Sequence, residues 1–330
     1  MSGPVIVLVE APGDEPDRLS LEALALARGL ADALGGGTAV EAVLVGPGAA
    51  ASSASAALAG HGVAVAHVPS DAWLHAYAPA AWAAALGAVI DARGAAAAIG
   101  PGSDRGSEVL AHVAARAGLP MAANVVAAEP GVSWHLTRQR WAGSLLEDAT
   151  LDAPVRLMTA APHAFSAEPP GIGGAPTVVA LGITLADRDL LVRVVSQESP
   201  VEGAVTLTDA KVVVGGGRGV GSAAGFAIID ELAALLGGAV GVSRAVTSAG
   251  WRPHAEQIGQ TGTRVAPDLY IACGISGAIQ HIVGCKAAKR ILAINKDPDS
   301  PIMGVADYAV IGDLGSVVPA ISAEIRRRRS

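Results

Sequence analysis

Hydrophobic residues in the first half of the chain alternate between short β-branched runs and longer segments with helical spacing. The short runs are typical of strands, whereas the longer segments place apolar residues three or four positions apart, as on one face of a helix. This alternation predicts a largely parallel sheet connected by crossover helices. The predicted strands are residues 5–9, 40–45, 63–68, 95–99 and 121–127, and the predicted helices are residues 19–34, 79–92 and 105–117.

The second half of the chain resumes this alternation after an interruption. Residues 132–162 contain closely spaced strand-like runs and no good helix, which predicts a β-rich flap. Residues 192–210 lose the pattern around Pro200 and Gly203, so we place a domain boundary there and a hinge near Gly203. The later predicted strands are residues 211–214, 239–241, 269–273, 290–294 and 308–311, and the later predicted helices are residues 222–236 and 278–288.

These patterns predict an α/β chain of two doubly wound domains. Residues 1–199 are expected to form an N-terminal α/β domain with the β-rich flap, and residues 200–330 a C-terminal Rossmann-like domain. A chain of 330 residues is long enough for two domains with separate cores. Aromatic residues make up 3% of the sequence, so Ala, Val, Leu and Ile must fill both interiors.

Charge and cysteine content exclude several classes of protein. The formal net charge of −7 argues against a nucleic-acid partner, because such a protein needs Lys and Arg to displace counterions. Cys273 and Cys285 have neither the number nor the spacing of a disulfide framework or a zinc site, which favours a reducing compartment. His281 lies four residues before Cys285 on a predicted helix with no third ligand nearby, so we expect no metal.

The two ends of the sequence also bear on location. The N-terminus has no basic leader, and no apolar run approaches the ~20 residues of a membrane span. We therefore expect a cytoplasmic protein with no membrane insertion. Residues 326–329 are all arginine and close a predicted helix, where they are expected to form a solvated end that compensates the helix dipole.

A glycine-rich loop follows the first predicted strand of the second domain. Residues 212–221 read VVVGGGRGVG, and an amphipathic helix is predicted to start at once. Glycines allow close backbone approach, and free N–H groups at a helix start attract phosphate or pyrophosphate. The spacing does not match G-x-G-x-x-G and no acidic residue follows about twenty positions on, which makes NAD less attractive. The alternative interpretation is that the loop is only a tight turn between strand and helix and that Arg218 forms a surface ion pair.

Polar residues also follow the other predicted strands of this domain. The carboxyl ends of parallel strands share one edge of a sheet, which is where such folds bind ligands. Ser276 is a possible helix N-cap, but its surroundings match the nucleophile elbow G-x-S-x-G only in part, and no acid or base is placed for a triad, so a hydrolase is not expected. The polar stretches are Ser243-Arg244, residues 258–262, 274–281 and 295–298, and Asp313-Leu314.

Several of these stretches resemble the FAD domain of electron-transfer flavoprotein alpha subunits. GGRGV, SRAV, IGQTG, PDLYIACGISGAIQH, AINKDPDSPI and VADYAVIGDL occur in the order and spacing of that family, nearly continuously over residues 211–320. The first half is similar more loosely, in its opening VIVLVE and in a helix around residues 106–116. The resemblance implies that residues 200–330 bind FAD and that residues 1–199 pack against a partner subunit.

The resemblance also implies a set of cofactor-binding residues. Arg218, Ser243, Arg244, Gln260 and Thr261 would line the FAD, with Gly259 and Gly262 shaping their loop; Ser276, Gly277, Ala278, Gln280 and His281 would contact the isoalloxazine or pyrophosphate; Asn295 and Lys296 would contact the diphosphate-ribose region, and Asp313 and Leu314 the adenosine end. Arg244 would lie beside the flavin ring, the Thr261 hydroxyl near N5, and His281 near N1 and O2, where reduction deposits negative charge.

The family implies a redox carrier of fatty-acid β-oxidation rather than an enzyme with its own substrate. Such a protein takes single electrons from acyl-CoA and related dehydrogenases and passes them to a membrane quinone oxidoreductase or another acceptor. It works as a heterodimer with the electron-transfer flavoprotein beta subunit. The alternatives are an electron-bifurcating or nitrogen-fixation-type paralogue and an NAD-dependent dehydrogenase built on the second domain.

Overall fold

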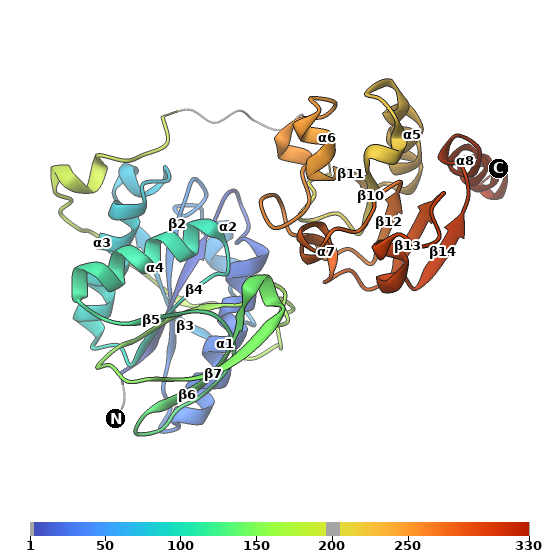
Figure 1. The fold of residues 1–330 in the computed structure, drawn as a ribbon. Helices are drawn as coiled ribbons and strands as arrows, with labels where there is room; N and C mark the ends of the chain where they lie inside the picture. Colours follow the sequence, from blue (N-terminus) through green and yellow to red (C-terminus); the bar gives the residue numbers. More distant parts are fainter. Residues whose placement is uncertain (1–2, 196–204, 330) are drawn as a thin grey trace. The chain divides into compact units, whose positions relative to one another are not determined.

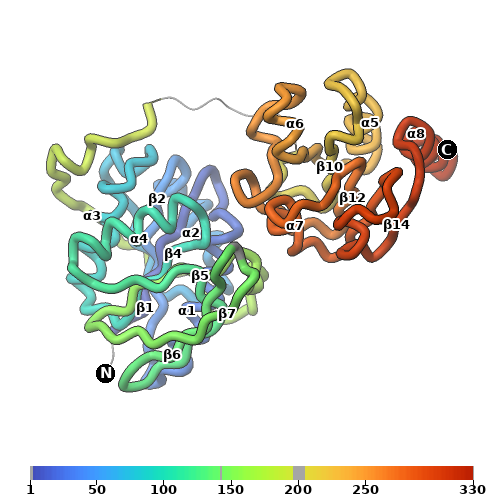
Figure 2. Tube along the Cα trace, viewed as in Figure 1, coloured from blue at the N-terminus to red at the C-terminus, as the bar shows by residue number. Residues whose placement is uncertain are grey.

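Each half of the chain folds around its own parallel or largely parallel sheet, which confirms the expected α/β class (Figure 1). The computed structural model describes residues 3–195 and 205–329, and the hinge expected near Gly203 lies outside these residues. The chain divides into two compact units, Met1–Gln197 and Glu198–Ser330, whose traces can be followed from blue to red in Figure 2. Within the described part of the chain, none of the helices has the length and apolar character needed to cross a bilayer.

The N-terminal unit contains a nine-stranded sheet in the order β7-β6-β5-β8-β4-β1-β2-β3-β9. Neighbouring strands are parallel, except that β6 runs antiparallel to β5 and β7. The strands are β1 (Val5–Glu10), β2 (Val40–Val45), β3 (Val63–Pro69), β4 (Ala97–Gly100), β5 (Met121–Glu129), β6 (Trp134–Arg140), β7 (Leu145–Leu151), β8 (Arg156–Ala160) and β9 (Thr177–Leu181). The helices are α1 (Arg18–Leu34), α2 (Ser52–Ala56), α3 (Pro79–Arg93) and α4 (Asp104–Ala117), with 3-10 turns at Ala72–Leu74, Trp141–Gly143 and Asp187–Leu190.

Strand β1 is covered by helices on both faces of this sheet. Val5, Val7 and Val9 belong to the core cluster that contains α1, whereas Ile6 and Leu8 belong to the cluster that contains α3 and α4. This division arises because successive side chains of a strand point to opposite faces. An uninterrupted apolar run is therefore the pattern of a central parallel strand, as the sequence indicated.

The region expected to form a flap contributes to the sheet in two ways. Strands β6 and β7 form an antiparallel hairpin at the sheet edge, which agrees with the expectation. The expectation was wrong for β8, which lies between β4 and β5 and is parallel to both. Most of the side chains of β8 are buried, so this strand is an interior element of the domain. Strand β9 was not predicted, because four of its five residues are exposed and no burial pattern marks it.

Glu41 is a fully buried acid in the middle of β2, between two basic side chains. Its carboxylate lies 2.6 Å from Nη2 of Arg93 and 2.8 Å from Nε2 of His67. Burial alone would raise the pKa of Glu41, but the hydrogen bonds from Arg93 and His67 outweigh it and leave the pKa below 4.5. Ionised Glu41 is therefore more stable in the folded chain than in the unfolded chain.

We expect Glu41→Gln to lower the free energy of unfolding of the N-terminal unit by about 1–3 kcal/mol, because a buried charge-assisted network loses its anion. The stabilisation by Glu41 is fully present above its unfolded pKa and is lost as the pH falls through the lower folded value. Urea denaturation as a function of pH measures both effects. The matched control is Glu147→Gln, which removes a partly exposed carboxylate that pairs with Arg138 and Arg140 and should cost less than about 1 kcal/mol. Equal costs for the two variants would contradict the expectation.

The C-terminal unit contains a five-stranded parallel sheet in the order β11-β10-β12-β13-β14. The strands are β10 (Val212–Gly216), β11 (Ala239–Val242), β12 (Leu269–Cys273), β13 (Ile291–Asn295) and β14 (Tyr308–Ile311). The helices are α5 (Ala227–Leu236), α6 (Arg244–Ser248), α7 (Ile279–Cys285) and α8 (Leu314–Arg329), with 3-10 turns at Arg218–Val220, Ala224–Phe226, His254–Glu256 and Pro301–Val305. From β10 the chain first adds β11 on one side of the sheet. It then returns to the other side of β10, where it adds β12, β13 and β14 in turn, so the strand order reverses between β10 and β12. That reversal is where open α/β sheets bind ligands.

The helix after the glycine-rich loop begins later than the sequence predicts. Helix α5 starts at Ala227 rather than at residue 222, and two 3-10 turns precede it. Gly221 adopts a positive φ of 88°, and the Ser222 hydroxyl accepts a hydrogen bond from the N–H of Gly225. These local bonds compete with helix formation and keep the loop in turns. The expected helix start directly at the loop is therefore wrong.

Both faces of the second sheet are covered by helices. Helices α5 and α8 pack on the face that contains Val214 and Ile271, and α7 packs on the face that contains Val213 and Tyr270. The arginines that close α8 are exposed; Arg326 pairs with Glu231 at 2.6 Å, Arg327 and Arg328 pair with Glu324, and Arg329 donates to the carbonyl of Leu235. The prediction of a solvated helix end is confirmed.

Candidate functional site

A pocket of about 550 Å³ opens at the carboxyl edge of the second sheet. Its walls come from the segments that follow β10, β11, β12 and β13 and from the loop of residues 257–261. The pocket therefore lies at the reversal of strand order, where the fold leaves backbone groups of two neighbouring loops facing the same space. Residues far apart in the sequence meet there.

Most residues that were expected to bind a cofactor line this pocket. They are Arg218, Ser243, Arg244, Gly259, Gln260, Thr261, Ser276, Gly277, Ala278, Gln280, His281 and Asn295. Four expected residues are not among its lining residues, namely Gly262, Lys296, Asp313 and Leu314. The structure thus brings most of the expected cofactor-binding residues to one pocket. Lining the pocket does not by itself show that a residue contacts the ligand.

The four remaining residues have structural partners of their own. Nζ of Lys296 lies 2.5 Å from the Asp313 carboxylate, and this bond lowers the pKa of Asp313. Leu314 is 6% exposed and belongs to the core cluster beneath the sheet edge. A Cβ added to Gly262 would lie 2.2 Å from the carbonyl oxygen of Gln257, so a glycine is needed to close that loop.

The loops after β10 and β12 form one wall by close backbone approach. The N–H of Gly217 donates to the carbonyl of Cys273 at 2.9 Å, and the N–H of Gly219 donates to the carbonyl of Gly274 at 3.0 Å. A Cβ on Gly219 would lie 2.7 Å from Cα of Gly274, and Gly274 itself has a φ of +61°. Glycine is required at both positions because no side chain fits between the two backbones.

Ser276 does not cap the helix that follows it. Helix α7 has seven residues and its N-cap is Ala278, which makes no side-chain capping bond. The residues between β12 and α7 form no regular structure, and the N–H of Ile302 donates to the Ser276 carbonyl at 3.1 Å. The expected N-cap role is therefore wrong, and Ser276 instead exposes its hydroxyl at the pocket.

Gln257 is a pocket residue that the sequence reasoning missed. Its buried amide donates to the carbonyl and the hydroxyl oxygen of Thr261 at 3.1 and 3.0 Å and accepts from the Thr247 hydroxyl at 2.6 Å. Gln257 thus holds the loop that carries Gln260 and Thr261. Its one sequence signal is its place directly before IGQTG.

The other missed lining residues lie inside the motifs that carry the resemblance. They are Gly219, Ala245, Ile258, Gly274, Ile275, Asp297 and Ser300. Several of these act through backbone groups, which residue chemistry does not reveal. Asn295, which was expected to contact the ligand, uses its amide to donate to the Ile275 carbonyl at 3.0 Å and its oxygen to accept from the N–H of Asp297. It therefore ties the ends of β12 and β13 together.

Two arginines bring positive charge to the pocket. Among the described residues, neither the Arg218 nor the Arg244 guanidinium makes a hydrogen bond or an ion pair, and both are exposed. Many other arginines in this structure are paired, as Arg252 is with Glu256 at 2.7 Å. Unpaired guanidinium groups at a concave edge favour a ligand that carries negative charge or an electron-rich ring.

His281 brings a buried, uncharged imidazole to the same pocket. It is 6% exposed, and burial lowers its pKa to about 4, an effect that interaction with the Ile258 backbone partly opposes. Its Nε2 lies 2.8 Å from the hydroxyl of Tyr270. Its Nδ1 is buried and completes no hydrogen bond within the described residues. The ring is therefore neutral at physiological pH.

The two thiols of this unit are structural. Cys273 and Cys285 are free and buried, and burial raises the pKa of each to about 12. Cys273 behaves as a small buried apolar group of the strand. Over the described residues, no group of three or more potential metal ligands comes together, so His281 and Cys285 acquire no third partner there.

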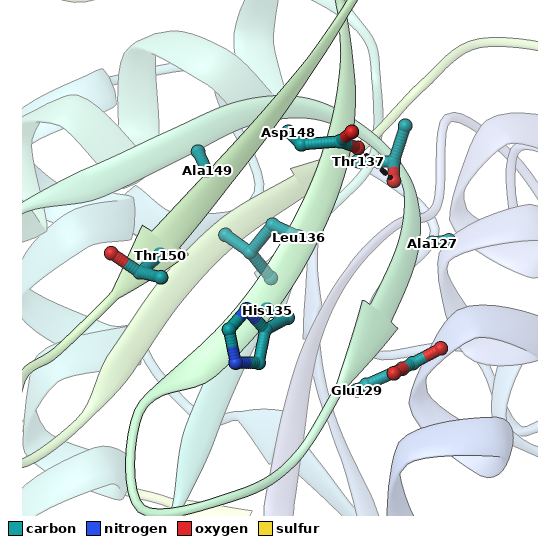
Figure 3. Close-up of a pocket in the computed structure, with 8 residues that line it drawn as sticks. All are labelled: Ala127, Glu129, His135, Leu136, Thr137, Asp148, Ala149 and Thr150. Carbon is teal, nitrogen blue, oxygen red and sulfur yellow. Dashed lines mark hydrogen bonds between the residues drawn. The ribbon is translucent and has the colours of Figure 1, made fainter.

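A second hollow lies on the β5–β6–β7 face of the N-terminal unit (Figure 3). Side chains of these three strands line it, including His135, Thr137 and Asp148. Figure 3 shows the Thr137 hydroxyl pointing at Asp148, to which it donates a hydrogen bond of 2.9 Å. We assign no site to this hollow.

Comparisons with known proteins connect the pocket to a family. The family model described as the electron transfer flavoprotein FAD-binding domain matches residues 206–286, and the electron transfer flavoprotein domain model matches residues 5–186. The chain is 39% identical over 225 residues to the electron transfer flavoprotein alpha subunit of Mycobacterium leprae, covering 68% of this chain and 69% of that protein.

Two other relatives match shorter segments. The electron transfer flavoprotein alpha subunit of Thermoanaerobacterium thermosaccharolyticum is 47% identical over 150 residues. This match covers 46% of this chain and 46% of that protein, less than half of each. Protein FixB of Clostridium saccharobutylicum is 42% identical over 194 residues, covering 58% of this chain and 57% of that protein. The pocket lies mostly within the segment that the FAD-binding domain model covers.

Proposed function

The chain belongs to the electron transfer flavoprotein alpha-subunit family, and from this premise we propose that it is the alpha subunit of a one-electron carrier whose FAD occupies the pocket of the C-terminal unit. The match to the FAD-binding domain identifies the cofactor as FAD. The observation that carries the proposed location is the convergence of residues from four strand ends on one pocket at the strand-order reversal.

The residues of the pocket fit the chemistry of FAD. The unpaired guanidinium groups of Arg218 and Arg244 suit a pyrophosphate and an electron-rich ring. The glycines let the loops after β10 and β12 meet backbone to backbone and so build one wall of the pocket. The imidazole of His281, which lines the pocket, is buried and neutral and so adds a polar group without adding charge. When bound, FAD supplies the redox chemistry, and the chain's residues hold and orient it.

We propose that the protein passes electrons between partner proteins and has no substrate turnover of its own. The donors would be acyl-CoA and related dehydrogenases, and the acceptor a membrane quinone oxidoreductase or another protein. The names of the relatives support electron transfer as the activity. The Thr261 hydroxyl, which accepts a hydrogen bond from Gln257, keeps its own proton available to donate at the pocket.

The proposed partner is the electron transfer flavoprotein beta subunit in a heterodimer. The alpha-subunit names of the relatives support it, and the N-terminal unit would supply the interface. We propose a cytoplasmic location, which would keep the buried thiols Cys273 and Cys285 in the free state that the structure shows. The similarity to Protein FixB supports a paralogue of nitrogen-fixation type as the second candidate.

The proposed function is tested by coexpression with an electron transfer flavoprotein beta subunit. We expect a yellow heterodimer that carries FAD and is reduced by an acyl-CoA together with its dehydrogenase. A count of flavins per heterodimer separates the candidates, because a bifurcating paralogue needs a second flavin in the beta subunit. A properly assembled heterodimer that is colourless and takes up no added FAD would contradict the proposal.

A further inference from the structure

Gln257 links two elements that border the pocket. The residue lines the pocket and is 2% exposed. Its amide nitrogen lies 3.1 Å from the Thr261 carbonyl oxygen and 3.0 Å from the Thr261 hydroxyl oxygen. Its amide oxygen lies 2.6 Å from the hydroxyl of Thr247 in α6, and Thr247 itself does not line the pocket. One amide therefore connects the helix that begins at Arg244 with the loop that carries Thr261.

We propose that Gln257 is a positioning residue that keeps the Thr261 hydroxyl as a hydrogen-bond donor to the ligand of the pocket. The proposal rests on the proposed function, in which that ligand is FAD. The ligand group that Thr261 meets is a hydrogen-bond acceptor, such as a carbonyl oxygen or an unprotonated ring nitrogen. A reversed Gln257 amide would draw the Thr261 proton to its own oxygen, so the direction of the amide decides which chemistry the pocket selects at this point.

The Thr261 carbonyl fixes which end of the Gln257 amide faces the loop. A carbonyl oxygen only accepts hydrogen bonds, so the amide nitrogen must lie toward it. In the reversed orientation two acceptor oxygens would lie 3.1 Å apart with no proton between them, which is unfavourable in a buried position. The two N–H groups of the amide then have two acceptors in Thr261, its carbonyl and its hydroxyl oxygen, and the amide oxygen accepts from Thr247.

This direction leaves the Thr261 hydroxyl with its own proton to donate. The hydroxyl oxygen accepts from Gln257, and within the described residues the hydroxyl donates to no other group. Thr261 is exposed and lines the pocket, so its proton needs no protein partner before a ligand binds. A ligand acceptor would complete a chain in which Thr247 donates to Gln257, Gln257 to Thr261, and Thr261 to the ligand. Hydrogen bonds in such a chain polarise and strengthen one another.

Backbone bonds hold Gln257 and Thr261 in one closed loop. The N–H of Ile258 donates to the carbonyl of Val242 at 2.9 Å, which ties the base of the loop to β11. The N–H of Thr263 donates to the Gln257 carbonyl at 2.7 Å and closes the other side. With both ends of the loop fixed to the sheet, the side chain of Gln257 is left to set the direction of the Thr261 hydroxyl.

The first test follows the Gln257 side-chain amide of the heterodimer by ¹H–¹⁵N NMR before FAD is added. Its two N–H signals are assigned by their loss in Gln257→Met, a variant of similar shape without the polar end. Thr261→Val removes one acceptor, so we expect it to shift one of the two signals, whereas Thr261→Ser keeps the hydroxyl and should leave both near their wild-type positions. Signals that Thr261→Val leaves unchanged would overturn the proposal, whether or not the protein binds FAD.

FAD titration of the same proteins supplies the second readout. We expect Gln257→Met to weaken FAD binding by about tenfold, the size of one hydrogen bond, and by less than about threefold in the Thr261→Val background. Equal weakening in both backgrounds would show that Gln257 merely holds the loop, and would contradict the proposal. The matched control is Ser248→Ala, which changes a polar residue of α6 that does not line the pocket and should leave the affinity unchanged.

A spectroscopic redox titration separates positioning from a purely structural role. A hydrogen bond donated to the flavin stabilises its reduced, more negative state more than its oxidised state. Gln257→Met should therefore lower the one-electron potential, and Thr261→Ser should keep it. A potential that Thr261→Val lowers but Gln257→Met leaves unchanged would overturn the proposal. If Gln257→Met does not fold, Thr247→Val decides, because it removes the donor to the amide oxygen from outside the pocket and should lower the potential only while Thr261 keeps its hydroxyl. Failure of the wild type to bind FAD would instead overturn the proposed function.

Discussion

Replacement of Arg244 by alanine is expected to lower the potential at which the bound flavin accepts its first electron by about 0.1–0.2 V. A positive charge about 4 Å from developing negative charge contributes about 4 kcal/mol at an effective dielectric of 20. For a one-electron step, a tenfold change in the equilibrium constant corresponds to about 1.4 kcal/mol and to about 59 mV. A contribution of about 4 kcal/mol therefore corresponds to a shift of about 0.1–0.2 V in the potential. Arg244 has no competing ion pair in the described residues, so its whole charge is available to the pocket. A spectroscopic redox titration of the heterodimer measures the potential.

Two further variants isolate the effect of the Arg244 charge. Arg244→Lys keeps a positive charge, so its one-electron potential should stay close to that of the wild type. Arg264→Ala removes an arginine of the same unit that does not line the pocket, and should shift the potential by far less. An unchanged titration curve for Arg244→Ala, or equal shifts for Arg244→Ala and Arg264→Ala, would contradict the proposed position of Arg244.

Gly274→Ala is expected to destabilise the C-terminal unit by about 2–4 kcal/mol and to weaken FAD binding by at least about tenfold. Its φ of +61° is strained for alanine, and the added Cβ would meet Cα of Gly219 and Cδ1 of Leu314, each at 2.8 Å. The strand-end loops that form the pocket wall would have to separate. Urea denaturation and FAD titration of the heterodimer measure the two losses.

Gly221→Ala is the matched control for Gly274→Ala. Gly221 also has a positive φ, +88°, but an added Cβ would find no atom within 4 Å, and the residue does not line the pocket. We expect a cost of about 1 kcal/mol in stability and no loss of FAD affinity. If both variants bind FAD as the wild type does, the contact between the loops after β10 and β12 does not shape the cofactor site.

The hydrophobic pattern predicted most of the strands, since parallel strands covered on both faces are apolar throughout. Val5 to Val9 is such a run, and the structure covers both of its faces. The pattern could not place β8, because nothing within Arg156–Ala160 shows that it inserts between β4 and β5. It also could not anticipate Glu41, a buried charge that is tolerated only because Arg93 and His67 meet it from distant segments.

In the candidate site, too, short sequence motifs predicted which residues come together, whereas contacts between segments far apart in the sequence could not be predicted. Motif resemblance placed Arg218, Arg244 and His281 together, and the structure brings all three to one pocket. Local rules failed at Ser276, which follows a strand as an N-cap would but precedes a helix that starts three residues later. Tyr270 appeared in the sequence as an ordinary strand residue, and its link to His281 emerges only from the packing of α7 on β12.

The central claim is that the carboxyl edge of the second sheet holds FAD, and a crystal structure of the yellow heterodimer tests it most directly. The account predicts dinucleotide density in the pocket, against the wall that the loops after β10 and β12 form together, with Arg218 and Arg244 beside it. A heterodimer that contains FAD elsewhere while this pocket is empty would contradict the account.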